Sequence, residues 1–330
     1  MANILVAGGA GFIGSHTLLA LNAAGHSLVT LDNLSNGHSD SVTYGKLVVG
    51  DLHDAALLDR VLVENNIDAV IHFAAFIEAG ESVVNPMVFY KNNVAGSLNL
   101  INAMIRNTVR TIVFSSTAAV YGQEGGDTLL SEALPKLPIN PYGHSKWMVE
   151  CMLRDAAAIG KLDAIALRYF NAAGSDPEGR LGERHDPETH LIPLVLDAAR
   201  GTRKDIKIFG NDYDTPDGTC IRDYVHVADL ATAHVLAVDR LLASGGESAG
   251  FYDAMNLGTS KGHSVREVIE MAKQVTGIDF KVIEQDRRPG DPACLVADAS
   301  RAHAVLGWQP QRSDLKTMIE DTWRFRRTLT

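Results

Sequence analysis

The chain has 330 residues, of which 46 % are apolar and 21 % charged, and its 40 acidic and 30 basic side chains give a net charge of −10. This composition is typical of a soluble globular protein of about two domains and excludes disorder and collagen-like repeats. The acidic balance argues against nucleic acid as a partner. The three cysteines are far apart and fit neither a disulfide framework nor a zinc knuckle, so a reducing cytoplasm is the expected compartment.

Residues 1–31 contain no Asp, Glu, Lys or Arg, so a signal peptide or a membrane span has to be considered first. The first basic residue is Lys46, so the positive segment of a signal peptide is missing. Gly8, Gly9, Gly11 and Gly14 interrupt the apolar run that a membrane span needs. The sequence therefore predicts a buried strand followed by a helix, and no membrane association.

Short β-branched runs alternate with segments of helical periodicity in the first half of the chain. Such alternation predicts a doubly wound parallel sheet with helices on both faces, in which ligands bind at the carboxyl ends of the strands. Strands are expected at Asn3–Ala7, Ser27–Asp32, Lys46–Gly50, Ala69–Phe73, Thr111–Ser115 and Ala164–Arg168, and helices at Phe12–Ala24, Asp54–Asn65 and Tyr142–Ile159.

The texture of the sequence changes after Asn171, where glycines and prolines crowd into a long polar connection that indicates a domain boundary. We expect residues 1–172 to form the first domain, with 222–245 returning to it, and 173–330 to form mainly a smaller α/β lobe. The expected strands of this lobe are Ile206–Phe209, Asp253–Leu257 and Phe280–Ile283, and the helices near it are Leu191–Arg200, Val227–Leu242, Val265–Thr276 and Asp314–Arg326, with Arg324–Arg327 at a solvated helix end.

A glycine cluster, Gly8–Gly14, lies between the first strand and the first helix. Glycines there let backbone N–H groups at a helix N-terminus approach a pyrophosphate. Asp32 closes the second strand, where a carboxylate can accept both ribose hydroxyls of a dinucleotide and repel a 2′-phosphate. No Arg precedes Arg60, so NAD is predicted rather than NADP. Asp51 closes the third strand and either reaches the adenine edge or caps the next helix.

Tyr142 and Lys146 stand four residues apart at the start of a helix, so both point from one face. The spacing alone is weak evidence, because chance produces it often. Its position supports a functional interpretation, since the pair follows the fifth strand, which ends near Thr117. A neighbouring ammonium lowers the pKa of a phenol, which would make Tyr142 a general base near neutral pH.

Four motifs together resemble the extended short-chain dehydrogenase/reductase superfamily: Gly8–Gly14, Ser115–Gly122, Tyr142–Lys146 and Arg168–Asn171. This resemblance implies a Rossmann-type sheet with a smaller C-terminal substrate-binding lobe. Three longer segments are similar to the UDP-glucose 4-epimerase family: Gly80–Ser82 before Asn92–Val94, Ile208–Tyr213 through Asp217–Thr219, and Arg222–Val227.

The resemblance implies an isomerase of galactose metabolism that interconverts UDP-galactose and UDP-glucose, with NAD as cofactor, as a homodimer. In this scheme Tyr142 removes the proton of the sugar 4-hydroxyl while C4 loses hydride to NAD+. The resulting 4-keto sugar rotates about its link to the diphosphate and takes hydride back on its other face. Thr117 is expected to hydrogen-bond the reacting oxygen, and Lys146 to hold the nicotinamide ribose and tune Tyr142.

The family's binding residues carry over to matching positions of this chain. Residues 1–172 are expected to bind NAD and 173–330 mainly the UDP-sugar. The expected cofactor residues are Gly8, Gly11, Phe12, Ile13, Gly14, Asp32, Asn33, Asp51, Leu52, Phe73, Ala74, Ala75, Asn93, Thr117, Tyr142, Lys146 and Phe170, and the expected substrate residues are Thr117, Tyr142, Asn171, His190, Leu191, Phe209, Arg222, Arg288, Asp291 and Leu295.

The chain departs from the family pattern at three positions. Ile77 replaces a Lys that family members have near the nicotinamide ribose, and His190 stands where Asn is frequent. Leu295 is intermediate between the bulky Tyr of epimerases restricted to glucose and galactose and the smaller residues of those that accept N-acetylated sugars. Interconversion of UDP-GlcNAc and UDP-GalNAc is therefore a secondary prediction.

Rival functions fit the sequence less well. A 4,6-dehydratase usually has an Asp-Glu pair where this chain has Ala118 and Ala119, and oxidation to a uronic acid lacks a nearby nucleophilic Cys. An NAD-binding regulatory module and an epimerase of UDP-glucuronate or UDP-GlcNAc stay open. His185 and His190 are five apart and H-E-x-x-H is missing, so no metal site is expected.

Overall fold

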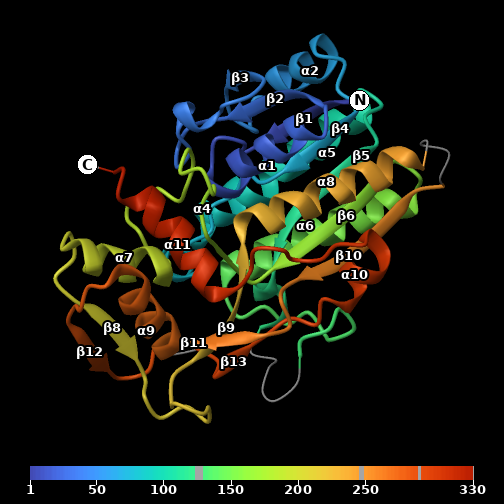
Figure 1. Cartoon of the computed structure of the whole chain (residues 1–330). Coiled ribbons are helices and arrows are strands. Elements are labelled where there is room, and N and C mark those ends of the chain that lie inside the picture. The colour runs from blue at the N-terminus through green and yellow to red at the C-terminus, as the bar shows by residue number, and fades with distance from the viewer. Residues whose placement is uncertain (123–128, 245–248, 289–290, 330) are drawn as a thin grey trace.

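The computed structural model describes residues 1–122, 129–244, 249–288 and 291–329. A large parallel sheet with helices on both faces forms one lobe, and a smaller α/β lobe lies beside it (Figure 1). Within the described ranges, no helix has the length and hydropathy that crossing a bilayer requires.

The large sheet has seven parallel strands in the order β10-β6-β5-β4-β1-β2-β3. The strand order reverses between β1 and β4, and such a reversal opens a crevice at the carboxyl ends of the strands. Its strands are β1 (Asn3–Ala7), β2 (Ser27–Asp32), β3 (Lys46–Val49), β4 (Ala69–His72), β5 (Thr111–Thr117), β6 (Asp163–Tyr169) and β10 (Phe251–Leu257).

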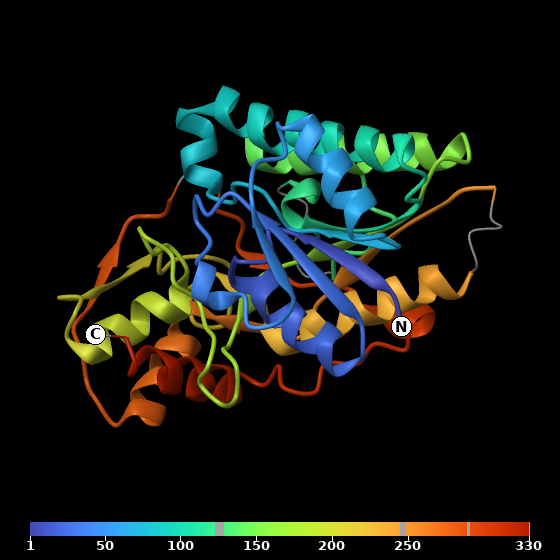
Figure 2. The same ribbon diagram turned by 90° about the horizontal axis from the view of Figure 1, so that it is seen from above.

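Helices cover both faces of this sheet (Figure 2). On one face α1 (Phe12–Ala23) packs against α8 (Val227–Ala243), and α10 (Ser300–Leu306) lies beside α8 and β10. On the other face lie α2 (Ala55–Glu64), α5 (Gly96–Arg106) and α6 (Pro141–Ala158). The central strands β1, β4, β5 and β6 are almost wholly buried between these layers, which explains their continuous apolar runs.

The connection between β4 and α5 is helical, with α3 (Ala79–Val84), α4 (Pro86–Phe89) and a π-helical segment η2 (Tyr90–Ala95). Two short 3₁₀ segments, η1 (Ser39–Ser41) and η3 (Ala118–Tyr121), follow β2 and β5. The η3 segment directly continues β5, so the chain turns sharply at the carboxyl edge of the sheet.

The smaller lobe is built around β9 (Ile221–His226), which pairs with β7 (Asn171–Ala173), β11 (Gly262–Ser264) and β13 (Cys294–Leu295). A separate pair, β8 (Ile206–Phe209) and β12 (Val282–Gln285), runs parallel. The helices α7 (Leu191–Arg200), α9 (Val265–Thr276) and α11 (Leu315–Arg326) share an apolar core with these strands. Ser264 and Glu267 form a capping box that fixes the start of α9.

The predicted doubly wound α/β fold of the Rossmann type is confirmed. Three local predictions are wrong. Asp253–Leu257 belongs to β10 and extends the large sheet by pairing with β6, rather than the smaller lobe. The strand expected at Phe280–Ile283 begins two residues later, as β12. Arg326 is buried, at 7 % exposure, and bonded to Asp197, so this part of the chain end is not solvated.

Candidate functional site

The turn between β1 and α1 accepts only glycine at two positions. Gly8 has φ +81°, and a Cβ there would lie 2.5 Å from the backbone nitrogen of Ala74. A Cβ on Gly14 would lie 2.3 Å from the carbonyl oxygen of Gly8. Gly11 precedes α1 and has no side chain to cap it, so the first N–H groups of the helix stay open to an anion.

Asp32 lies at the carboxyl end of β2, 8 % exposed, at the edge of the same pocket. Its carboxylate accepts the backbone N–H groups of Ala10 at 2.9 Å and Leu34 at 2.8 Å. Each carboxylate oxygen has further lone pairs for a ligand. Because Asp54 accepts the Leu57 N–H and caps α2, the capping alternative for Asp51 is wrong.

Asp51 instead accepts from the Asn33 amide at 2.8 Å and from the His53 N–H at 2.9 Å. These bonds tie the ends of β2 and β3 together beside Asp32. The pocket wall therefore carries two fixed carboxylates where the adenosine half of a dinucleotide is expected.

Thr117, Tyr142 and Lys146 line one pocket at the carboxyl edge of the sheet. Thr117 closes β5, and its side chain lies beside the Tyr142 phenol, where it acts to lower the pKa of that phenol. Asn140 caps α6 through the Gly143 N–H, which starts the helix where Tyr142 and Lys146 share its inner face. A hydroxyl, a phenol and an amine thus meet as the sequence predicts, and their catalytic roles stay predictions.

The electrostatics of this trio differ from the expectation. Burial raises the pKa of Tyr142 to about 12, against an opposing effect of the Thr117 hydrogen bond. Burial lowers the pKa of Lys146 to about 7, which the carboxylate of Glu150 opposes. The Lys146 amine donates to the Ser115 carbonyl oxygen at 2.8 Å. The expected lowering of the Tyr142 pKa by Lys146 is therefore wrong for the ligand-free protein, because desolvation dominates.

A buried ion pair that the sequence did not predict holds the helix of this trio against the sheet. Arg168 of β6 donates through Nε to Glu150 of α6 at 2.9 Å, and the two side chains are 3 % and 0 % exposed. Glu150 also accepts from Ser116 and from the Tyr252 hydroxyl. The pair joins α6 to β5, β6 and β10 and so fixes the helix that carries Tyr142 and Lys146.

Most of the expected cofactor residues line this single pocket. Asn93 does not line it: its side chain bonds both backbone groups of Phe76 and the Ser145 hydroxyl, so it braces the pocket wall. The predicted residues that line the pocket are Gly8, Gly11, Phe12, Ile13, Gly14, Asp32, Asn33, Asp51, Leu52, Phe73, Ala74, Ala75, Thr117, Tyr142, Lys146 and Phe170, and residues not predicted include Ser35, Asn36, Gly37, Phe76 and His185.

The expected substrate residues divide into two groups. Asn171 and His190 line the pocket with Thr117 and Tyr142. The others lie outside its lining, and Leu191 among them begins α7. In the smaller lobe, Arg222 lies opposite Leu295 in the β9–β13 pairing, with its guanidinium 3.5 Å from the Asp291 carboxylate, and the Arg288 guanidinium lies 3.8 Å from the centre of the Phe209 ring.

The loop between β7 and α7 brings Glu183, His185, Glu188 and His190 together, and we call these four residues the Glu/His cluster. His185 and His190 also line the pocket. The prediction that no metal site exists rested on the spacing of the two histidines and on the missing H-E-x-x-H motif, and it did not consider the glutamates beside them. The two glutamates at positions 183 and 188 were the missing signal, because a loop can fold all four side chains inward.

Comparisons with known proteins agree with this fold. A family model described as the NAD dependent epimerase/dehydratase family matches residues 4–258. The chain therefore belongs to the NAD-dependent epimerase/dehydratase family. It is 50 % identical to a UDP-glucose 4-epimerase of Rhizobium meliloti over 323 residues, which cover 98 % of this chain and 96 % of that one.

Two solved structures are similar over nearly the whole chain. One is UDP-glucose 4-epimerase from Brucella ovis in complex with NAD, with 46 % identity, a TM-score of 0.94 and 98 % of both chains covered. The other is the UDP-Glc/GlcNAc 4-epimerase of Campylobacter jejuni, with 41 % identity, a TM-score of 0.85, and 99 % of this chain and 100 % of that chain covered.

Proposed function

We propose that this chain is an NAD-dependent isomerase that interconverts UDP-galactose and UDP-glucose by inverting C4 of the sugar. The observation that carries the proposal is the meeting of Thr117, Tyr142 and Lys146 in the pocket that begins at the glycine turn. Reversible oxidation of an alcohol requires a group that transfers the proton and a dinucleotide that accepts the hydride. The names of the similar proteins select a 4-epimerase within that reaction class.

The residues present fit NAD. The glycine turn packs the start of α1 closely against Gly8, since a Cβ at Gly14 would collide with the Gly8 carbonyl group, and it leaves the first N–H groups of α1 without a side-chain cap for a pyrophosphate; Asp32 offers a carboxylate for ribose hydroxyls. NAD+, when bound, supplies a positive charge and an acceptor that takes hydride from C4 and returns it. Lys146 would hold the nicotinamide ribose, and this role is supported by its place in the pocket lining with Phe73 and Phe170.

Tyr142 moves the proton in this proposal. Its phenolate takes the proton of the sugar 4-hydroxyl, and the 4-keto sugar forms as the C4–H bond breaks. After the ketone turns over, Tyr142 returns the same proton to the oxygen. Thr117, which lines the pocket together with Tyr142, would hold the reacting oxygen throughout. Because burial raises the pKa of Tyr142, we expect the positive charge of bound NAD+ to favour the phenolate.

The smaller lobe is proposed to hold the UDP group, with Asn171, His190, Leu191, Phe209, Arg222, Arg288 and Asp291 as contacts. Arginines suit a diphosphate because their N–H groups match its oxygens. Leu295, next to Arg222 in the sheet, leaves more room than a Tyr would. The similarity to a UDP-Glc/GlcNAc 4-epimerase supports UDP-GlcNAc and UDP-GalNAc as secondary substrates.

We further propose that the enzyme is a cytoplasmic homodimer. The adjacent helices α4, α5 and α6 expose large apolar side chains, among them Met87 at 68 %, Leu98 at 43 % and Met148 at 43 %. Exposed apolar patches of this kind are typical of subunit interfaces. Light scattering after gel filtration is expected to give twice the mass of one chain, and Met148→Glu to shift it toward one.

The reaction is tested by incubating the purified protein with UDP-galactose, UDP-GalNAc or UDP-glucuronate, without added NAD, and identifying products by NMR. We expect UDP-galactose to equilibrate with UDP-glucose fastest. Tyr142→Phe is expected to lose at least about a hundredfold in turnover and to keep its NAD affinity. Conversion of UDP-glucuronate alone, or full activity of Tyr142→Phe, would contradict the proposal.

A further inference from the structure

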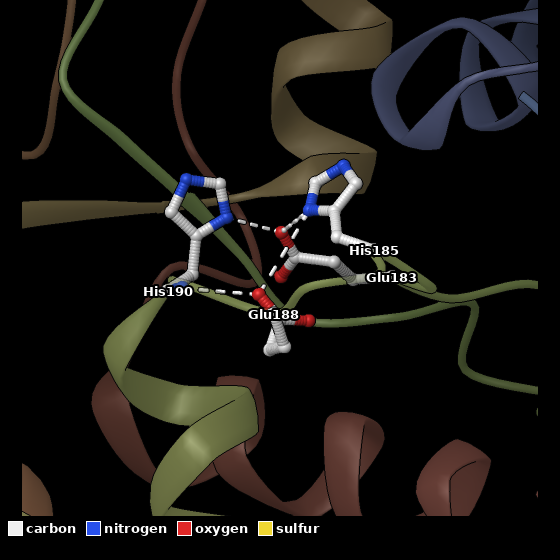
Figure 3. Close-up of side chains that lie close together, drawn as sticks. All are labelled: Glu183, His185, Glu188 and His190. Atoms are coloured by element: carbon white, nitrogen blue, oxygen red, sulfur yellow. Dashed lines mark hydrogen bonds and ion pairs between the residues drawn. The ribbon is translucent and has the colours of Figure 1, made fainter. Parts of the chain in front are cut away.

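The Glu/His cluster lies in the loop between β7 and α7, at the wall of the pocket. Its members follow one another at intervals of two, three and two residues, and one ligand atom from each lies within 4.8 Å of all the others. Figure 3 shows the two imidazole rings on either side of the Glu183 carboxylate, with Glu188 below them. Four donor atoms from one short loop thus surround one point.

Both histidines turn the same ring atom inward. The Nδ1 atom of His185 lies 3.0 Å from Oε1 of Glu183 and 3.8 Å from Oε1 of Glu188, and the Nδ1 atom of His190 contacts Oε1 of Glu183 (Figure 3). Glu188 is held in place because its Oε1 accepts the backbone N–H groups of Thr189 and His190. Oε1 of Glu183 therefore contacts the Nδ1 atoms of both imidazoles, and a cation bound between these atoms could take the place of those contacts.

The cluster is buried, and its two carboxylates depend on the two imidazoles, or on a bound cation, for compensating charge. The Glu183 and Glu188 side chains are 2 % and 8 % exposed, and buried carboxylates require compensating charge. The nearest guanidinium, Arg326, lies 3.6 Å from Oε2 of Glu188 but makes its hydrogen bonds to Asp197 and to the Glu183 carbonyl oxygen. Oε2 of Glu188 is buried without a hydrogen-bond partner among the described residues.

The donor types and spacings suit a tetrahedral metal ion. Imidazole nitrogen and carboxylate oxygen bind Zn²⁺ at roughly 2.0–2.2 Å, which places neighbouring donors about 3.4 Å apart. The separations of 3.0 Å and 3.8 Å around His185 Nδ1 bracket that value. The widest pair of donor atoms, at up to 4.8 Å, would have to approach by up to about 1.4 Å through rotation of the side chains.

We propose that the Glu/His cluster binds one Zn²⁺ ion per chain, through Nδ1 of His185 and His190 and one carboxylate oxygen each of Glu183 and Glu188. The ion would fix two pocket-lining imidazoles and the loop that leads from the large sheet into α7. Its role is structural support of the pocket wall rather than chemistry on the substrate, and the proposal stands independently of the reaction.

The test is calorimetric titration of ZnSO₄ into chelator-treated, dialysed enzyme, with Glu183→Gln and His185→Asn as site variants. We expect one tight site per chain, weakened at least about tenfold in each variant. His263→Asn is the matched control, because its side chain is 14 % exposed against 16 % for His185, and it lies 3.7 Å from the single carboxylate of Glu267. This control is expected to bind Zn²⁺ as the wild type does.

Circular dichroism and NAD titration establish that each variant is folded, so a lost site is not mistaken for a lost fold. Anomalous scattering at the zinc edge is expected to place the ion between His185 and His190. Absence of stoichiometric binding at 100 µM Zn²⁺ would show that the cluster is a carboxylate–imidazole network only. Equal affinity in the wild type and both site variants would place the ion elsewhere, and either result overturns the proposal.

Discussion

The glycine turn gives the sharpest prediction about cofactor binding. In Gly14→Ala the new methyl group would lie 2.3 Å from the Gly8 carbonyl oxygen and 2.8 Å from the Gly9 Cα atom. Non-bonded carbon atoms prefer about 3.5 Å or more, so the start of α1 must move away from the turn by about 0.7 to 1 Å. A displacement of this size breaks the alignment of the N–H groups that we propose to hold the pyrophosphate.

A hydrogen bond to a charged group contributes roughly 1.5–3 kcal/mol, so losing one weakens NAD binding by about 10- to 100-fold. The assay is calorimetric titration of NAD into cofactor-stripped protein, with circular dichroism as a check of folding. Gly80→Ala is the control, because a Cβ at Gly80 meets no atom within 4 Å and is expected to leave binding unchanged. A folded Gly14→Ala variant with wild-type NAD affinity would refute the reasoning.

Three further predictions concern buried charges. Glu150→Gln leaves the Arg168 guanidinium buried without its carboxylate and is expected to lower the free energy of unfolding, measured in urea, by about 3 kcal/mol. The control Arg106→Gln removes an exposed ion pair and is expected to lower it by less than about 1 kcal/mol. Equal losses in the two variants would contradict the role of the buried pair. Asp32→Asn is expected to narrow the preference for NAD over NADP at least about tenfold in titrations, and an unchanged ratio would exclude Asp32 as the discriminating group. Burial lowers the pKa of Lys146 to about 7, so between that value and the ordinary 10.5 the unfolded chain binds the extra proton. The stability of the cofactor-free wild type relative to Lys146→Met should then rise by up to about 1.4 kcal/mol per pH unit from about pH 7.5 to about pH 9.5, and a flat difference would show that the amine is not desolvated.

Local sequence signals predicted the large sheet well, because each central strand is buried on both faces and reads as an apolar run bounded by turn residues. The same signals could not place β10. Its partner β6 lies far away in the sequence, and pairing over such a distance leaves no local trace. Placement of Asp253–Leu257 in the smaller lobe followed from chain order alone.

The meeting of Thr117, Tyr142 and Lys146 was predictable because their spacing and their position after a strand restrict where the side chains point. The contacts of Glu150 and the Glu/His cluster were not, because their partners come from different elements or from an irregular loop. The predicted direction of the Tyr142 pKa shift was wrong for a related reason. The sequence indicated a neighbouring cation, but the degree of burial, which dominates the shift, depends on the packed structure.

In the proposed reaction, the C4 carbon of the sugar loses and regains the same hydrogen while its ketone is held in the pocket. Incubation of the protein with UDP-galactose deuterated at C4, in ordinary water, tests this claim directly by NMR and mass spectrometry. We predict UDP-glucose that keeps deuterium at C4, formed without added NAD. UDP-glucose that carries solvent hydrogen at C4 would contradict the mechanism, since the hydride would then not have been returned from a retained cofactor.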